Sequence, residues 1–375
     1  MTEQLIKATE IWVEKTNVAN SKIVEQELAV ENLSEGEVLL KIDSFGFSAN
    51  NITYAMFGDK MGYWGFFPAN EQWGIVPVWG FATVIASTHP ALKVGERMYG
   101  YLPMASHWIV QVGKESATGF IDVHPKRKSI SPVYDNYLYC AADPGYREDR
   151  EPWQLNYRPL FMTSFVLDDF VREGLCEAQQ NSSDVRQVIL TSASSKTAYG
   201  AAHLLLKHKA ESDLGYQVIG LTSPANKEFT SSLGCYDKVF AYDEVDALSF
   251  EQNSWVLDFA GNKSLLLQLQ VLLGDKLGKL LLIGSTDVEA QQDKPDGNLN
   301  SEFFFAPSQV KKRMHEWGKE GFSVKYAQAW QGFATQLGDN LKVASYSGAE
   351  AIQKVYQFGL QGSLSNAELN VLKFD

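Results

Sequence analysis

From residue 158 to about residue 283, short apolar runs of strand length alternate with helical stretches. The runs typical of strands are Val188–Leu190, Val218–Leu221, Lys238–Tyr242, Val256–Phe259 and Leu280–Ile283. The stretches of helical pattern are Arg158–Arg172, Thr197–His208, Pro224–Leu233 and Ser264–Leu273. This alternation, with short turns, is typical of a parallel sheet with helices on both faces. The sequence therefore predicts an α/β fold with a doubly wound, Rossmann-type parallel sheet.

About the first 130 residues have a different pattern, with short β-branched and aromatic runs between Gly, Pro, Asn and Ser. These runs are Val38–Ile42, Val76–Ile85, Arg97–Tyr101 and His107–Val112. They predict a β-rich domain. Residues 134–157, rich in Asp, Pro, Arg and Tyr, predict a long connecting loop. The tail after residue 303 combines helical patterns (307–337 and 349–360) with a short final strand.

Composition excludes several classes of protein. The 375 residues allow about two or three domains. A net charge of −12, without a Lys/Arg stripe, disfavours nucleic-acid binding. The three cysteines lie far apart, which fits a reducing compartment. No apolar run approaches the ~20 residues of a membrane span, and residues 1–20 lack the apolar region of a secretory signal. We expect a cytoplasmic protein without a membrane span.

The segment that follows Val188–Leu190 carries the main functional signal. It reads TSASSKTAYGAAHLLLK, a cluster of small residues that leads into a helix. A helix that begins at the carboxyl edge of a parallel sheet offers backbone N–H groups to a pyrophosphate. The usual glycines are absent, and Ser192, Ser195 and Ala198 stand at a three-residue spacing instead. Small side chains leave room for a dinucleotide, but serine tolerates positive φ less well than glycine.

The residues of this turn predict cofactor contacts at Ser192, Ser194, Ser195, Lys196 and Thr197. A P-loop is excluded, because Leu190 and Ser195 occupy the places where that motif needs glycine. Lys196 either places a cation beside a phosphate or is a solvated lysine at a helix end.

The end of the second strand indicates which dinucleotide is bound. Val218–Leu221 is followed by Thr222, Ser223 and, after three more residues, Lys227, with no Asp or Glu to hold ribose hydroxyls. Small hydroxyls beside a lysine suit a 2′-phosphate and therefore NADPH. A solvent-facing helix cap would explain Ser223 equally well. Two further strand ends, at Gly261 and at Gly284–Ser285, predict contacts along the nicotinamide ribose.

Motifs along nearly the whole chain resemble those of the medium-chain dehydrogenase/reductase superfamily, in its zinc-free, quinone-oxidoreductase-like branch. The matching segments are Glu37–Gly46, Gly46–Asn51, Pro77–Gly80, Val94–Gly100 and Gly348–Gly362. Val94–Gly100 is similar to the family's Val-Gly-Asp-Arg-Val turn, and Gly348–Gly362 to its final helix. The SASSKT turn departs most from the family pattern and is similar to that of an uncharacterised subfamily.

The resemblance implies a GroES-like catalytic domain (residues 1–157 with 303–375) and an inserted dinucleotide-binding domain (158–302). It also implies a cofactor cleft between them and a homodimer. The family's zinc-binding cysteine falls near Ala49–Asn51, where no cysteine occurs, and the six histidines form no cluster with metal-ligand spacing. We therefore expect no metal.

Without a metal, hydride transfer needs a hydrogen-bond donor at the oxygen that gains charge. Tyr54 lies in the segment matching the family's substrate loop, and its phenol can donate at neutral pH. Asn51, in the family's Asp position, would orient nicotinamide or substrate, and Tyr63 is the reserve donor. Alternatively, the tyrosine rings pack against the protein with their hydroxyls exposed to solvent, and Asn51 caps a turn.

Nine of the 28 residues from Tyr54 to Phe81 are aromatic, against 12% in the whole chain. Trp64, Phe66 and Phe67, close to Gly62 and Gly65, are candidates for an apolar substrate wall. The core of a small β-domain would account for most of these rings as well.

The leading hypothesis is a zinc-independent, NADPH-dependent reductase that passes hydride to an activated alkene or carbonyl of an apolar small molecule. The rival is a non-catalytic protein of the same fold that binds a nucleotide or another ligand through an altered turn.

Overall fold

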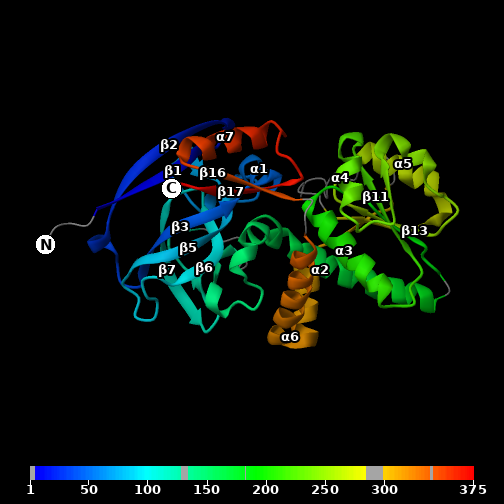
Figure 1. Ribbon diagram of the computed structural model, residues 1–375, viewed down its shortest axis with the longest axis horizontal. Coiled ribbons are helices and arrows are strands. Elements are labelled where there is room, and N and C mark those ends of the chain that lie inside the picture. Colours follow the sequence, from blue (N-terminus) through cyan, green and yellow to red (C-terminus); the bar gives the residue numbers. More distant parts are fainter. Residues whose placement is uncertain (1–4, 128–133, 182, 284–298, 338–340) are drawn as a thin grey trace. The chain divides into compact units, whose positions relative to one another are not determined.

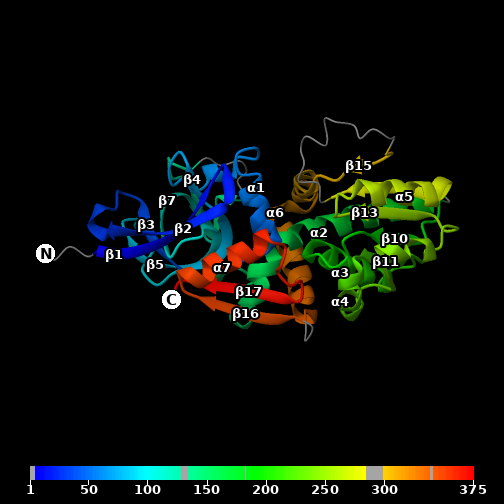
Figure 2. The ribbon, with the colours of Figure 1, turned by 90° about the horizontal axis from the view of Figure 1, so that it is seen from above.

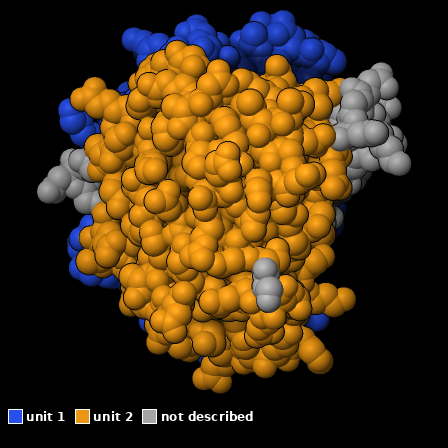
Figure 3. Space-filling model, turned by 90° about the vertical axis from the view of Figure 1, so that its right-hand side faces the viewer, with its two compact units in different colours: residues 1–159, 341–375 blue, residues 160–340 orange. Residues whose placement is uncertain are grey.

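The computed structural model describes residues 5–127, 134–181, 183–283, 299–337 and 341–375. The chain forms two compact units, coloured separately in Figure 3. Unit 1 comprises residues 1–159 and 341–375, and unit 2 comprises residues 160–340. The boundary falls inside helix α2 (Glu151–Gln180), next to Pro159.

Unit 1 is built around a closed β-barrel. Its strands are β1 (Leu5–Glu14), β2 (Asn17–Ala29), β3 (Glu37–Gly46), β4 (Trp73–Ile75), β5 (Pro77–Ser87), β6 (Arg97–Pro103), β7 (His107–Ser116), β8 (Gly119–Asp122), β9 (Asn136–Tyr139), β16 (Lys342–Ser347) and β17 (Glu368–Lys373). The order β3-β5-β6-β9-β8-β7 returns to its start, because β3 pairs with both β5 and β7. A closed sheet has no free edge.

Smaller elements of unit 1 pack around this barrel. β16 and β17 pair in parallel and lie side by side in both ribbon views (Figures 1 and 2). β17 joins the barrel at β3, and β1 forms a second sheet with β2 and β4. Helix α7 (Ala349–Leu360) packs against β2 and helix α1 (Ala49–Met56). The inward-facing residues form an aromatic-rich core.

Unit 2 contains the predicted parallel sheet. Its strands are β10 (Gln187–Leu190), β11 (Gln217–Thr222), β12 (Lys238–Ala241), β13 (Ser254–Asp258), β14 (Leu277–Leu282) and β15 (Glu302–Phe303). All neighbours pair in parallel, in the order β12-β11-β10-β13-β14-β15. Numbered along the chain, this is 3-2-1-4-5-6, the order of a Rossmann sheet. β10 and β13 are buried throughout, as the central strands of such a sheet are.

The helices of unit 2 are the later part of α2, α3 (Lys196–Ala210), α4 (Lys227–Ser232), α5 (Lys263–Leu273) and α6 (Ala306–Gln336, with a break at Gly318). α3 and α2 lie very close at Gly200, where a Cβ atom would meet the Ser164 hydroxyl oxygen at 2.7 Å. α6 packs on α2 through rings, with Phe333 and Trp330 at centroid distances of 4.9 and 5.5 Å from Phe161.

The architecture confirms the predicted fold class, while two segments differ from expectation. Residues 134–157 are not one loop, because they contain barrel strand β9 and the start of α2. Turn-forming residues flank the four strand residues of β9 and obscure them in the sequence. Residues 303–337, which the family resemblance assigns to the catalytic domain, belong to unit 2. Helical periodicity does not tell which core the apolar face meets.

Among the described residues, no helix combines the length and the apolar character that crossing a membrane requires.

Candidate functional site

The turn after β10 lies at the point of the sheet where the strand order reverses. β10 has β11 on one side and β13 on the other, so the carboxyl ends of β10 and β13 form the switch point. Ligands of open α/β sheets bind at such points. α3 begins there at Lys196, and its N-cap Ser195 accepts a hydrogen bond from the Ala198 N–H at 3.4 Å. The predicted turn residues Ser192, Ser194, Ser195, Lys196 and Thr197 are therefore together at this edge.

Ser192 adopts the backbone conformation that glycine usually supplies. Its φ is +47°, the only positive φ at a non-glycine among the residues that the structure describes. Its N–H donates to the Tyr242 hydroxyl at 3.1 Å, and its carbonyl accepts from the Ser195 N–H at 2.8 Å. A left-handed non-glycine residue costs about 1–2 kcal/mol and persists when its surroundings hold it. The turn thus keeps the conformation of a glycine turn without the glycine.

This strain predicts a stability effect at residue 192. We expect Ser192→Val to lower the free energy of unfolding by about 2 kcal/mol, because a β-branched residue is an outlier at positive φ. Ser192→Gly should leave it unchanged or raise it by up to about 1 kcal/mol. Denaturant unfolding of both variants measures the difference. Equal stability of the two would show that the left-handed conformation is not required.

A buried carboxylate connects the turn to the end of β13. Asp258 is 1% exposed and accepts a hydrogen bond from the Thr191 hydroxyl at 2.5 Å. Its two oxygens also accept from the N–H groups of Ala260, at 3.2 Å, and Gly261, at 2.9 Å. Gly261 has a φ of +69°, and nothing lies within 4 Å of where its Cβ would be. Asp258 therefore holds the loop that presents Gly261.

The predicted contacts at the end of β11 lie beside the turn. The Thr222 hydroxyl donates to the Ser194 hydroxyl at 3.3 Å, and Asn226 donates to the Ser223 hydroxyl at 3.0 Å. Lys227 is paired with Glu244, whose carboxylate oxygens lie 2.5 and 2.7 Å from the ammonium nitrogen. Glu244 comes from the segment after β12. Gly284 and Ser285 lie outside the described residues.

Electrostatics single out Lys196. Its removal from water lowers the pKa of its ammonium group to about 8. An ammonium group with a lowered pKa is poorly hydrated, and an anion beside it would stabilise the charged form. Lys196 is therefore suited to a phosphate at the start of α3.

Unit 1 holds the other predicted group, Tyr54. This residue lies on α1, is 6% exposed, and its hydroxyl accepts a hydrogen bond from the Asn50 amide at 2.7 Å. Its ring contacts those of Tyr63 and Tyr101 at centroid distances of 4.6 and 5.6 Å. Burial raises the pKa of the Tyr54 hydroxyl well above 10, and the same holds for Tyr63 and Tyr101. These phenols are therefore protonated at neutral pH and can donate.

Two buried polar atoms belong to this tyrosine cluster (Tyr54, Tyr63, Tyr101 and Tyr134, with Trp79). The Tyr101 hydroxyl and the Trp79 ring N–H have no hydrogen-bond partner of standard geometry among the described residues. Their rings lie 5.0 Å apart. Both groups lie close enough to the Tyr54 hydroxyl to lower its pKa, against the larger effect of burial.

The other predicted residues of unit 1 have structural contacts. The Asn51 side chain accepts from the Ser48 N–H at 2.8 Å and donates to the Pro77 carbonyl at 3.0 Å, so it caps α1 and ties it to the chain at β5. Trp64, Phe66 and Phe67 are buried in the core. Whether any of them contacts a substrate stays a prediction.

Sequence reasoning missed Tyr242, Glu244 and the roles of Thr191 and Asp258. Thr191 directly follows the buried strand β10, and Asp258 is the last residue of the buried strand β13. Their position at these strand ends could have identified them from the sequence. Tyr242 and Glu244 come from the 3₁₀ segment Tyr242–Ala247 after β12. No sequence motif indicates that these two residues belong to the site. Within the described parts of the chain, no group of three His, Cys, Asp or Glu side chains could hold a metal ion.

Solved structures share this fold at low sequence identity. CurA from Vibrio vulnificus in complex with NADPH is 12% identical, with 98% of this chain and 99% of that chain covered and a TM-score of 0.59. An Etr1p/NADP/crotonyl-CoA complex is 14% identical, with coverage of 98% and 100% and a TM-score of 0.56. The quinone oxidoreductase from Coxiella burnetii is 12% identical, with coverage of 99% and 100% and a TM-score of 0.53.

No curated protein matches the sequence. A family model described as "Protein of unknown function (DUF2855)" matches residues 45–365. Since this match spans most of the chain, the protein belongs to the DUF2855 family.

Proposed function

We propose that this protein is a zinc-independent, NADPH-dependent reductase that transfers hydride to an activated alkene or carbonyl of an apolar small molecule. The observation that carries the proposal is the polar turn Ser192–Thr197 at the switch point of a 3-2-1-4-5-6 parallel sheet. That is where dinucleotides bind in sheets of this order. The proposal places the protein in the zinc-free, quinone-oxidoreductase-like branch of the medium-chain dehydrogenase/reductase superfamily. It also includes assembly as a homodimer.

The residues of the turn fit a dinucleotide diphosphate. The left-handed Ser192 keeps the backbone conformation of a glycine turn, and the first turn of α3 has N–H groups that lack acceptors within the helix. Lys196 adds a positive charge at the same place. Ser194, Ser195 and Thr197 have short side chains whose hydroxyls can donate hydrogen bonds. Gly261 leaves open space at the neighbouring strand end. These residues would hold the cofactor, which supplies the hydride when bound.

The chemistry that we assign to unit 1 is proton donation. Reduction of an enone or carbonyl places charge on an oxygen, and a positioned hydroxyl stabilises it. Tyr54 is a protonated phenol fixed by Asn50 and by two ring neighbours. The adjacent Tyr101 hydroxyl and Trp79 N–H are further buried donors that a substrate oxygen could use. Tyr63 is the reserve donor.

The fold likeness supports the substrate class. The structure of CurA was solved with NADPH, and that of Etr1p with NADP and crotonyl-CoA, an activated alkene. The rival proposal, a non-catalytic binding protein, is favoured by one observation. Glu244 neutralises Lys227, the residue that we assign to the 2′-phosphate.

A turnover assay distinguishes these proposals. The protein would be mixed with NADPH and, in turn, a quinone, an enone, an aldehyde and crotonyl-CoA, and absorbance of the reduced cofactor would be followed. We expect oxidation of NADPH with at least one acceptor, and slower oxidation of NADH. Binding of NADPH without turnover of any acceptor class would favour the binding protein.

The ion pair of Lys227 and Glu244 makes a separate prediction about cofactor choice. We expect Glu244→Gln to increase the preference for NADPH over NADH several-fold, because it removes a negative charge beside the proposed 2′-phosphate position. Lys227→Ala should reduce the preference for NADPH over NADH by about tenfold, because it removes one charge-assisted contact to the 2′-phosphate. Titration with both cofactors measures the ratios. Unchanged ratios in both variants would remove Lys227 from the site.

A further inference from the structure

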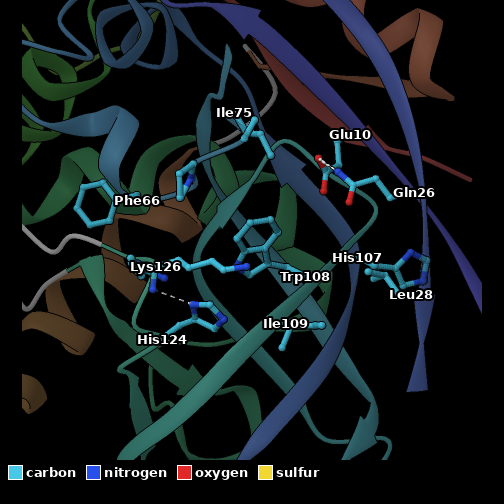
Figure 4. Close-up of a pocket in the computed structure, with 13 residues that line it drawn as sticks. Glu10, Gln26, Leu28, Phe66, Ile75, His107, Trp108, Ile109, His124 and Lys126 are labelled. Carbon is cyan, nitrogen blue, oxygen red and sulfur yellow. Dashed lines mark hydrogen bonds between the residues drawn. The ribbon is translucent and has the colours of Figure 1, made fainter. Parts of the chain in front are cut away.

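Unit 1 contains a cavity to which the proposed reaction assigns no step, although Phe66, a candidate for the substrate wall, is among the residues that line it. Its volume is about 250 Å³. It lies where the β1–β2 hairpin meets β7 and the segment after β8. The lining residues that matter here are Glu10 and Gln26 from the hairpin, Trp108 from β7, Phe66 and Lys126. Figure 4 shows Glu10 and Gln26 on one side of the Trp108 ring and Lys126 on the other.

Glu10 is the unusual member of this wall. It is 6% exposed, although carboxylates are almost never buried without partners. Its Oε2 atom accepts from the Trp12 ring N–H at 2.5 Å and from the Gln26 amide at 3.1 Å. Both bonds use the same oxygen, and no described residue donates to Oε1. Since Glu10 lines the cavity, this oxygen is available there as an acceptor.

The neighbouring charges leave this end of the cavity negative. The Arg127 guanidinium is neutralised by Asp122 and Asp135, at 2.9 and 3.0 Å. Burial, and then the charge of Lys41, lowers the pKa of His107, so its ring is uncharged at neutral pH. Lys126 and His124 lie at the other side of Trp108 (Figure 4). Burial raises the pKa of Glu10, and a bound cation would offset that effect.

We propose that this cavity binds a small aromatic primary amine, whose ammonium group pairs with Glu10 and the Gln26 side chain and whose ring packs on Trp108. An ammonium group has three donors, two of which would bond to the Glu10 Oε1 atom and the amide oxygen of Gln26. The indole face of Trp108 and the Phe66 ring supply the apolar wall. The cavity is smaller than sites for drug-sized ligands, which start near 300 Å³, and it suits a one- or two-ring amine.

Calorimetric titration of the full chain with tryptamine tests the site, with indole-3-propionate as the matched acid. We expect tryptamine to bind with one site per chain and the acid to give no heat. Glu10→Gln should weaken tryptamine binding by at least tenfold. Glu25→Gln, an exposed glutamate on β2, is the matched control and should bind as the wild type does.

Gln26→Leu provides a second variant in case Glu10→Gln unfolds. Gln26 is exposed, so this change should preserve the fold, and we expect at least threefold weaker tryptamine binding. The proposal is overturned if tryptamine does not bind the wild type, if the acid binds as tightly as the amine, or if a folded Glu10→Gln or Gln26→Leu variant binds normally. NADPH affinity should be unchanged in all variants, so this site and the proposed reductase activity stand or fall separately.

Discussion

Replacing Tyr54 by phenylalanine is expected to lower turnover at least about a hundredfold and to leave NADPH affinity unchanged. General acid catalysis by a positioned side chain contributes about 10²–10⁴-fold, and phenylalanine cannot supply the proton. The ring contacts with Tyr63 and Tyr101 are retained. The interactions of the hydroxyl with Asn50, Trp79 and Tyr101 are lost. Steady-state kinetics with the best acceptor measure the effect.

Two further variants make this result specific. Tyr356→Phe is the matched control, because Tyr356 is also buried in unit 1 and its hydroxyl only donates to the Val18 carbonyl. We expect it to keep full turnover. Tyr63→Phe should cost less than about tenfold if Tyr63 is only the reserve donor. Full turnover of a folded Tyr54→Phe variant would contradict the proton-donor role.

The pKa shift of Tyr54 adds an expectation about pH. Burial moves its pKa above 10, so the phenol stays protonated from about pH 6 to about pH 9. The proton-donating form is lost only when the pH rises through that raised pKa. Loss of turnover at a pKa below about 9 would therefore come from another group.

Replacing Asp258 by alanine is expected to lower the free energy of unfolding by about 3 kcal/mol and NADPH affinity by at least about tenfold. The change leaves the Thr191 hydroxyl and the N–H groups of Ala260 and Gly261 without their acceptor. Each hydrogen bond to a charged group contributes about 1.5–3 kcal/mol, and part of the loss is recovered by water. The loop that presents Gly261 would then lose its fixed position at the switch point.

Denaturant unfolding and NADPH titration measure both effects. Asp275→Ala is the control, because Asp275 is an exposed aspartate of the same unit. We expect it to change stability by less than about 0.5 kcal/mol. Normal NADPH affinity in a folded Asp258→Ala variant would show that the end of β13 does not contribute to the site.

The sequence predicts the sheet of unit 2 well because its strands are continuous apolar runs between clear turns. Val188–Leu190 and Val256–Leu257 are buried in the centre of the sheet, so both runs are apolar throughout and are recognisable without knowledge of the neighbouring strands. The α6 helix shows the limit of this reasoning. Its helical pattern is evident, but its packing on Phe161 depends on a contact between residues more than 160 positions apart.

The candidate site shows a similar division. The turn Ser192–Thr197 is visible as small residues between a strand and a helix. The left-handed conformation of Ser192 is not visible, because serine seldom adopts it and the Tyr242 hydroxyl that holds it comes from a distant segment. The pairing of Lys227 with Glu244 is hidden for the same reason. Local patterns predict local structure, while long-range hydrogen bonds need the fold.

The binding of NADPH to this turn is tested most directly through Lys196. The anionic diphosphate favours the protonated lysine, whose pKa is about 8 in the folded chain. Raising the pH through that value removes the charge, so the affinity of the wild type for NADPH should fall by roughly tenfold between about pH 7 and about pH 9.5. Lys196→Arg should bind at both pH values, because arginine stays charged. Lys196→Met should bind weakly at both. Titration of the three proteins with NADPH gives the answer: a fall in the wild type alone supports binding at the turn, and no NADPH binding by the wild type, or equal affinity in Lys196→Met, would contradict it.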